Sequence, residues 1–155
     1  PIEKVTDEEL IKTIKLNTVV PFELIRKTVP YMKKQNWGRI INIGSISGVM
    51  GEAFAGTYSM TKASLIGLTK ALALELAQYN ITVNIINPGW VDTELINNDN
   101  LEANFSKEEI IETIPQRRFV LPEEIAATCG FLISENARTV TGQNINICAG
   151  LSLGC

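Results

Sequence analysis

Apolar residues recur every three or four positions in two long segments of the chain, which is the spacing of one helix face. The first segment follows a capping box, Thr6-Asp-Glu-Glu9, and its predicted inward face carries Leu10, Ile14, Asn17, Pro21, Leu24, Thr28 and Met32. The second segment has a predicted inward face with Tyr58, Lys62, Leu65, Thr69, Leu72 and Leu76. We therefore expect two long helices, each buried along one side.

Short runs rich in β-branched residues alternate with these helices and predict strands over residues 39–43, 81–86 and 143–148. Residues 44–56 predict a glycine-rich loop. Ser106-Lys-Glu-Glu109 is a second capping box, and Pro122 is well placed as the first residue of a further helix. The order α-β-α-β-α-α-β is typical of an α/β domain with a parallel sheet.

Length and charge narrow the class of protein. The chain has 155 residues, of which 45% are hydrophobic and 20% charged, and this fits one globular domain. Its 14 basic and 17 acidic residues give a net charge of −3, whereas a nucleic-acid-binding domain normally carries a basic excess. No run approaches the ~18 apolar residues that span a bilayer. We expect neither a nucleic-acid partner nor a membrane partner.

The absence of some residue types limits the chemistry further. The sequence contains no histidine, which excludes Ser-His-Asp and Cys-His nucleophilic catalysis and His-ligated metal sites. Its three cysteines form no C-x-x-C motif, so neither a zinc knuckle nor a redox pair is expected. Scattered thiols suit a reducing compartment, and we expect a cytoplasmic protein without a bound metal.

The candidate chemistry begins with Tyr58-Ser-Met-Thr-Lys62. Four residues apart on a helix, the phenol and the ammonium lie on one face, which continues as the apolar positions Leu65 and Leu72. A positive charge so close to a phenol favours the phenolate, so Tyr58 is a candidate general acid and base. The alternative is that Tyr58 packs in the core while Lys62 extends to solvent, because this spacing is common.

Two further residues join this pair. Ser45 follows a predicted strand, at the end where open α/β sheets bind ligands, and its hydroxyl is suited to hold a carbonyl oxygen that Tyr58 protonates. Asn17 lies four residues before Pro21, which has no N–H to donate to the Asn17 carbonyl. That carbonyl needs a water or an ammonium, and Lys62 is the candidate. A simple helix kink at Pro21 is the alternative.

With these residues in this order, the chain resembles the C-terminal part of a short-chain dehydrogenase/reductase. It is most similar to the 3-oxoacyl-(acyl-carrier-protein) reductase and glucose-dehydrogenase-like members. The resemblance covers almost the whole chain in family order and rests on Asn17, Gly38-Arg-Ile-Ile-Asn-Ile-Gly-Ser45, Tyr58-x-x-x-Lys62, Asn87-Pro-Gly-Trp-Val-Asp-Thr93, Arg118-x-x-x-Pro-Glu-Glu-Ile-Ala126 and Val140-Thr-Gly-Gln143.

The resemblance implies a Rossmann-like, doubly wound parallel sheet. Residues 1–155 would form the C-terminal part of one NAD(P)-binding domain, without its N-terminal strands, because the family's Thr-Gly-x-x-x-Gly-x-Gly fingerprint is absent from the chain. Gly44-x-x-x-Gly48-x-x-Gly51 is not a substitute, since we expect no helix directly after it. The active protein would have ~90 further residues, and residues 1–155 alone would bind a dinucleotide poorly and expose a strand edge.

The resemblance also implies roles for single residues. Asn17 would hold a water in a proton relay, Ser45 would orient the substrate oxygen, Tyr58 would transfer the proton, and Lys62 would hold the nicotinamide ribose and favour the phenolate. Binding of the cofactor, NAD or NADP, would involve Tyr58, Lys62, Pro88, Gly89, Val91 and Thr93. The substrate would contact Ser45, Tyr58 and Trp90 beneath a lid formed by residues 92–118.

The implied function is an NAD(P)-dependent oxidoreductase that interconverts a ketone and a secondary alcohol, acting on a small-molecule substrate. A truncated or non-catalytic scaffold domain that retains the fold is the alternative, and a tyrosine-dependent dehydratase or epimerase is a third. The resemblance further implies a homodimer built through the first two long helices, or a homotetramer that also uses the last helix and strand.

Overall fold

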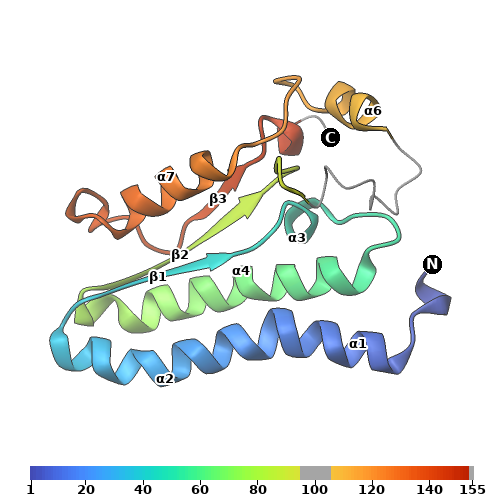
Figure 1. Cartoon of the computed structure of the whole chain (residues 1–155). Helices are drawn as coiled ribbons and strands as arrows, with labels where there is room; N and C mark the ends of the chain where they lie inside the picture. Colours follow the sequence, from blue (N-terminus) through green and yellow to red (C-terminus); the bar gives the residue numbers. More distant parts are fainter. Residues whose placement is uncertain (95–105, 154–155) are drawn as a thin grey trace.

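The computed structural model of the chain describes residues 1–94 and 106–153 (Figure 1). In these ranges the chain forms, in order, η1 (Ile2–Lys4), α1 (Asp7–Ile14), η2 (Lys15–Val19), α2 (Val20–Gln35), β1 (Gly38–Ile43), α3 (Ser47–Met50), α4 (Gly56–Leu76), η3 (Ala77–Tyr79), β2 (Ile81–Pro88), α6 (Lys107–Thr113), α7 (Pro122–Ile133), η4 (Glu135–Ala137), β3 (Asn144–Ile147) and η5 (Leu151–Leu153). The expected alternation of helices and strands is confirmed.

The first long helix is continuous from α1 to α2 but contains a π-helical segment, η2, in its middle. It begins at the predicted capping box, where the Thr6 hydroxyl accepts a hydrogen bond from the Glu9 N–H (3.2 Å) and the Glu9 carboxylate accepts one from the Thr6 N–H (2.9 Å). The π segment ends at Val19, two residues before Pro21, which cannot donate to the carbonyl four residues back. The wider turn therefore lies where the ordinary α-helical pattern is interrupted.

This π segment shifts the buried face of the helix that follows it. Each i→i+5 turn encloses one residue more than an α turn, so later side chains are displaced by about one position. Leu24, which the periodicity places inward, is 61% exposed, and Thr28 is also exposed, whereas the adjacent Ile25 and Val29 pack in the core. The predicted inward face is thus wrong at Leu24 and Thr28 and correct again at Met32.

The three strands form a parallel sheet in the order β1-β2-β3. α2 and α4 pack on one face, and α7 packs on the other (Figure 1). The central strand β2 is buried at every position from Ile81 to Asn87, as expected for a strand covered on both faces. The doubly wound arrangement is therefore confirmed, with β1 and β3 at the two edges of the described sheet.

The core joins this sheet to the two long helices. One polar pair lies inside it: the Asn42 side-chain N–H donates to the Thr69 hydroxyl at 2.9 Å, and both residues are buried. The main apolar cluster consists of Ile25, Ile40, Ala73, Leu76, Ile81 and Val83. None of the described helices combines the length and the apolar character needed to cross a bilayer.

Two backbone hydrogen bonds from residues that follow β1 hold the carboxyl ends of β1 and β2 together. The Gly44 N–H donates to the Ile86 carbonyl (2.7 Å), and the Ile46 N–H donates to the Pro88 carbonyl (3.1 Å). Gly44 is required by this close approach, since a Cβ there would lie 2.2 Å from the Asn87 Oδ1. The loop that follows contains the short helix α3, which the glycine-rich pattern of residues 44–56 did not predict.

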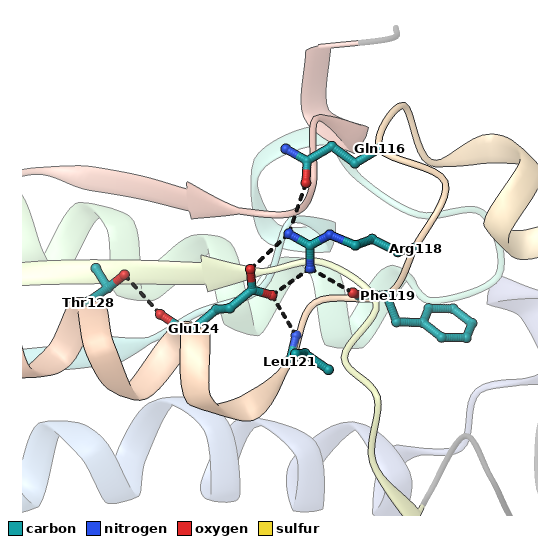
Figure 2. A network of polar contacts seen from close by, with 6 residues as sticks. All are labelled: Gln116, Arg118, Phe119, Leu121, Glu124 and Thr128. Carbon is teal, nitrogen blue, oxygen red and sulfur yellow. Dashed lines mark hydrogen bonds and ion pairs between the residues drawn. The ribbon is translucent and has the colours of Figure 1, made fainter.

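An arginine–carboxylate network fixes the start of α7 (Figure 2). The Arg118 guanidinium donates to both oxygens of Glu124, at 2.7 and 2.8 Å, and also to the Phe119 carbonyl at 3.2 Å. The same carboxylate accepts a hydrogen bond from the Leu121 N–H at 2.8 Å, which satisfies a free donor at the helix N-terminus. These contacts, led by the hydrogen bond from Arg118, lower the pKa of Glu124 to about 2.

We expect Glu124→Gln to lower the melting temperature at neutral pH, with a difference from the wild type that disappears in acid. A carboxyl group whose pKa is lowered by folding stabilises the protein above its ordinary pKa of 4.5 and loses this contribution as pH falls through about 2. Thermal unfolding followed by circular dichroism across this range measures the effect. Glu123→Gln, in the same turn but outside the network, is the matched control. A constant difference at every pH would contradict the prediction.

Candidate active site

A cavity of about 450 Å³ lies at the carboxyl ends of β1 and β2. It is the place where an open parallel sheet binds ligands. Six of the residues predicted from the sequence contribute to its lining: Ser45, Tyr58, Gly89, Trp90, Val91 and Thr93. Two others, Asn17 and Lys62, line a second cavity of about 420 Å³ together with Ile43 of β1.

Tyr58 and Lys62 lie on successive turns of α4 and connect the two cavities. The Lys62 Nζ is 5.7 Å from the centroid of the Tyr58 ring. It donates a hydrogen bond to the Ile43 carbonyl at 3.0 Å. Tyr58 is 38% exposed and faces the first cavity, so neither side chain follows the alternative of a core tyrosine beside a fully solvated lysine.

The environment of Lys62 opposes its charge. Partial burial lowers the pKa of Lys62 below its ordinary value of 10.5, because desolvation disfavours the ammonium form. Its hydrogen bond to a backbone carbonyl supplies one polar partner in compensation. The ammonium has two further N–H donors, and no second acceptor for them is found among the described residues.

Asn17 reaches the tyrosine through a threonine. Its side-chain N–H donates to the Thr61 hydroxyl at 3.2 Å, and that hydroxyl donates to the Tyr58 carbonyl at 2.8 Å. The direct contact expected between the Asn17 carbonyl and Lys62 is not formed in the described structure. Lys62 instead donates to the carbonyl of Ile43, the last residue of the edge strand β1. This carbonyl is an acceptor beside the cavity that Asn17 and Lys62 line.

Ser45 lies two residues after the end of β1 and takes part in a series of hydrogen-bonded hydroxyl groups that the sequence did not predict. Its hydroxyl donates to the Ser47 hydroxyl (3.1 Å) and accepts from the Ser47 N–H (3.2 Å). The Ser47 hydroxyl in turn donates to the Glu52 carboxylate at 2.6 Å. Ser47 and Glu52 also line the first cavity. The only sequence signal for this series of hydrogen bonds was the presence of three polar residues within one loop. Such a pattern does not predict that the three side chains contact one another.

The residues after β2 form the opposite wall of the cavity. The Gly89 N–H donates to the Ile147 carbonyl of β3 at 2.9 Å, and a Cβ on Gly89 would lie 2.8 Å from the Cβ of Cys148, so glycine is needed here. Val91 forms an isolated parallel bridge with Val120, whose N–H donates to the Trp90 carbonyl at 2.8 Å. This wall is therefore built on backbone bonds to β3 and to the segment before α7.

One side chain dominates the electrostatics of the first cavity. Of the described residues that line it, Glu52 alone carries a charge at neutral pH. Among the described residues, no three His, Cys, Asp or Glu side chains come together as a metal-binding group. In the proposed lid over 92–118, residues 95–105 lie outside the described structure, while α6 is helical and buries Ile110. The lid remains a prediction.

Comparison with known proteins shows the family to which the chain is related. Residues 1–152 match a family profile described as enoyl-(acyl carrier protein) reductase. A 3-oxoacyl-[acyl-carrier-protein] reductase of Buchnera aphidicola is 39% identical over 94% of this chain and 59% of its own length. The chain thus spans about three fifths of this relative.

Solved structures show the same fold. A polyketide ketoreductase (actinorhodin, F189W) with NADPH superposes with a TM-score of 0.90 at 33% identity, covering 98% of this chain and 62% of its own. A 4-hydroxyisoleucine dehydrogenase complexed with NADH gives a TM-score of 0.87 at 34% identity, covering 100% of this chain and 64% of its own. Because the family profile matches residues 1–152 of the 155, the chain belongs to the short-chain dehydrogenase/reductase family.

Proposed function

We propose that the protein containing this chain is an NAD(P)-dependent oxidoreductase that interconverts a ketone and a secondary alcohol, with Tyr58 as its general acid and base. One observation carries the proposal: Tyr58 and Ser45 line a single cavity at the carboxyl edge of the sheet, and the Lys62 ammonium lies 5.7 Å from the tyrosine ring. The related ketoreductase and dehydrogenase structures, which contain NADPH and NADH, support the choice of cofactor class.

The donors of this chain fit a nicotinamide ribose. The Lys62 ammonium uses one N–H on the Ile43 carbonyl and offers the other two to ribose hydroxyls. Val91 and Thr93, beside the turn at Pro88 and Gly89, would line the nicotinamide side of the cavity. The polyphosphate part of the cofactor would need groups outside this chain, in keeping with the proposal that residues 1–155 are the C-terminal part of one dinucleotide-binding domain.

A bound nicotinamide supplies or accepts the hydride at the reacting carbon. The Ser45 hydroxyl would hold the carbonyl oxygen of the substrate, with Trp90 on the far wall of the same cavity. In reduction, the Tyr58 hydroxyl would give its proton to that oxygen, and in oxidation the phenolate would take the proton back. Asn17 would hold a water in the proton relay, close to the Thr61 hydroxyl that it already contacts.

The same proposal includes self-association and a cytoplasmic location. Large apolar side chains on the outer surfaces of the long helices, among them Tyr31 and Leu74, are strongly exposed, and so are Phe131 and Ile133 on α7. Burial of such side chains against a second copy would stabilise a homodimer or a homotetramer. The three scattered thiols favour a reducing compartment.

We expect Tyr58→Phe to lower kcat by a factor of ~10²–10⁴, the usual contribution of a positioned general acid or base, with cofactor affinity changed only slightly. The ring and its packing remain, and only the proton-transferring oxygen is lost. Absorbance of NAD(P)H measures turnover, and fluorescence titration measures cofactor binding. Tyr31→Phe, on an exposed face of α2, is the matched control. Turnover at the wild-type rate in the Tyr58 variant would contradict the role of Tyr58, whereas a wild-type protein that shows no turnover would favour the scaffold alternative.

We expect Lys62 to set an alkaline limit on alcohol oxidation. Because burial lowers its pKa below 10.5, the ammonium loses its proton, and with it the positive charge beside Tyr58, at a correspondingly lower pH. The value of kcat/KM should therefore fall on the alkaline side below pH 10.5. Lys62→Arg retains its charge, so its remaining activity should lack this decline. Lys70→Arg, exposed on the same helix, is the control. An unchanged alkaline limb in Lys62→Arg would refute the assignment.

A further inference from the structure

Glu52 is a carboxylate held in a fixed place on the wall of the cavity that contains Ser45 and Tyr58. Its Oε2 accepts a hydrogen bond from the Ser47 hydroxyl at 2.6 Å, a length typical of a charge-assisted bond. Ser47 itself is only 8% exposed and belongs to the single helical turn α3. The Glu52 residue is exposed, and the buried Ser47 hydroxyl anchors its carboxylate at the wall of the cavity.

The charge of Glu52 is not neutralised by the described part of the chain. No described lysine or arginine forms an ion pair with it, and the other described residues that line the cavity are uncharged. Glu3 lines an adjoining cavity that Glu52 also lines, but Glu3 is not among the residues that line the cavity containing Ser45. A carboxylate offers about four acceptor positions, and Ser47 uses one of them. The remaining positions are available to a bound molecule.

The position of this charge is defined relative to the reacting group. Glu52 is two hydrogen bonds from Ser45, through the Ser47 hydroxyl. A substrate whose carbonyl oxygen is held by Ser45 would therefore place atoms only a few bonds from its reacting carbon next to the carboxylate. A hydrogen-bond donor or a cationic group on those atoms would find an acceptor there, whereas an anionic group would face a like charge without compensation.

From this arrangement we infer that Glu52 is a specificity-determining residue: it selects ketones and secondary alcohols that carry an ammonium or hydroxyl group close to the reacting carbon and rejects those that carry a carboxylate there. The inference rests on the proposed oxidoreductase function, because it takes Ser45 and Tyr58 as the reacting end of the cavity. It goes further by naming the chemical class of substrate and the residue that chooses it.

The test compares three small secondary alcohols with different charge: 1-amino-2-propanol, 1,2-propanediol and 3-hydroxybutyrate. The ratio of kcat/KM for the amino alcohol to that for 3-hydroxybutyrate is measured with NAD and with NADP in the wild-type protein and in Glu52→Gln. We expect the wild type to favour the amino alcohol, and the variant to reduce this ratio at least ~10-fold, the loss expected for one hydrogen bond to a charged group. The change should appear mainly in KM.

Two matched variants separate a local from a general effect of charge. Glu3→Gln removes a neighbouring carboxylate that has no bond to Ser47, and the ratio should stay at its wild-type value. Ser47→Ala removes the anchor but keeps the charge of Glu52, so the preference for the amino alcohol should weaken without reversing. An equal loss of the ratio in Glu3→Gln and Glu52→Gln would overturn the inference, because a diffuse field would then explain the preference.

A binding measurement keeps this inference separate from the proposed function. Saturation-transfer NMR ranks the affinity of the same three alcohols without requiring turnover, in the wild type, in Glu52→Gln and in Tyr58→Phe. If no alcohol is oxidised but the ranking depends on Glu52, the proposed function fails, and only the selection of bound molecules by the charge of Glu52 is supported. If alcohols are oxidised but the wild type and Glu52→Gln rank them equally, the proposed function stands and the inference is wrong.

Discussion

Parallel pairing of β1 with β2 is the constraint on which the site depends. Their register brings Ile43 opposite Ile86, so both strands end at the same edge of the sheet. The bond from the Ile46 N–H to the Pro88 carbonyl then fixes the two following loops against each other. Because Ser45 is on one of these loops and Gly89 on the other, the walls of the cavity are placed by backbone hydrogen bonds. The backbone of both walls is therefore fixed independently of the side chains that line the cavity.

The π segment in the first helix connects sequence, packing and site. Proline at position 21 removes one helical donor, and the chain accommodates it with a wider turn centred on Asn17. This turn has two effects: it rotates Ile25 into the core in place of Leu24, and it leaves Asn17 directed at Thr61 on α4. One local irregularity thus sets both the packing of the helix and the position of a candidate relay residue.

Most of the fold could be predicted from the sequence, because the capping boxes, the β-branched runs and the 3.6-residue periodicity are local signals. Ser45 and Tyr58 could be placed near one sheet edge for the same reason. The exposure of Leu24, the helix α3 and the contact of Ser47 with Glu52 could not be predicted. Each of these features depends on the detailed geometry of one turn relative to the next. Hydrophobic periodicity reports only an average spacing and does not predict that geometry. The partner of Lys62 was also missed, since several carbonyls compete for one flexible ammonium.

Two residues of opposite charge line the two cavities of the candidate site. Lys62 lines the cavity bounded by Asn17 and β1, while Glu52 lines the cavity that contains Ser45 and Tyr58. Burial lowers the pKa of Lys62, and the Ile43 carbonyl gives the ammonium one polar partner. Under the proposed mechanism, a proton passing from Tyr58 to a carbonyl oxygen held by Ser45 would stay within the cavity that Glu52 lines, because all three residues line it. The two charged side chains would therefore act on different parts of the reaction: Lys62 on the ribose of the cofactor, and Glu52 on the substrate.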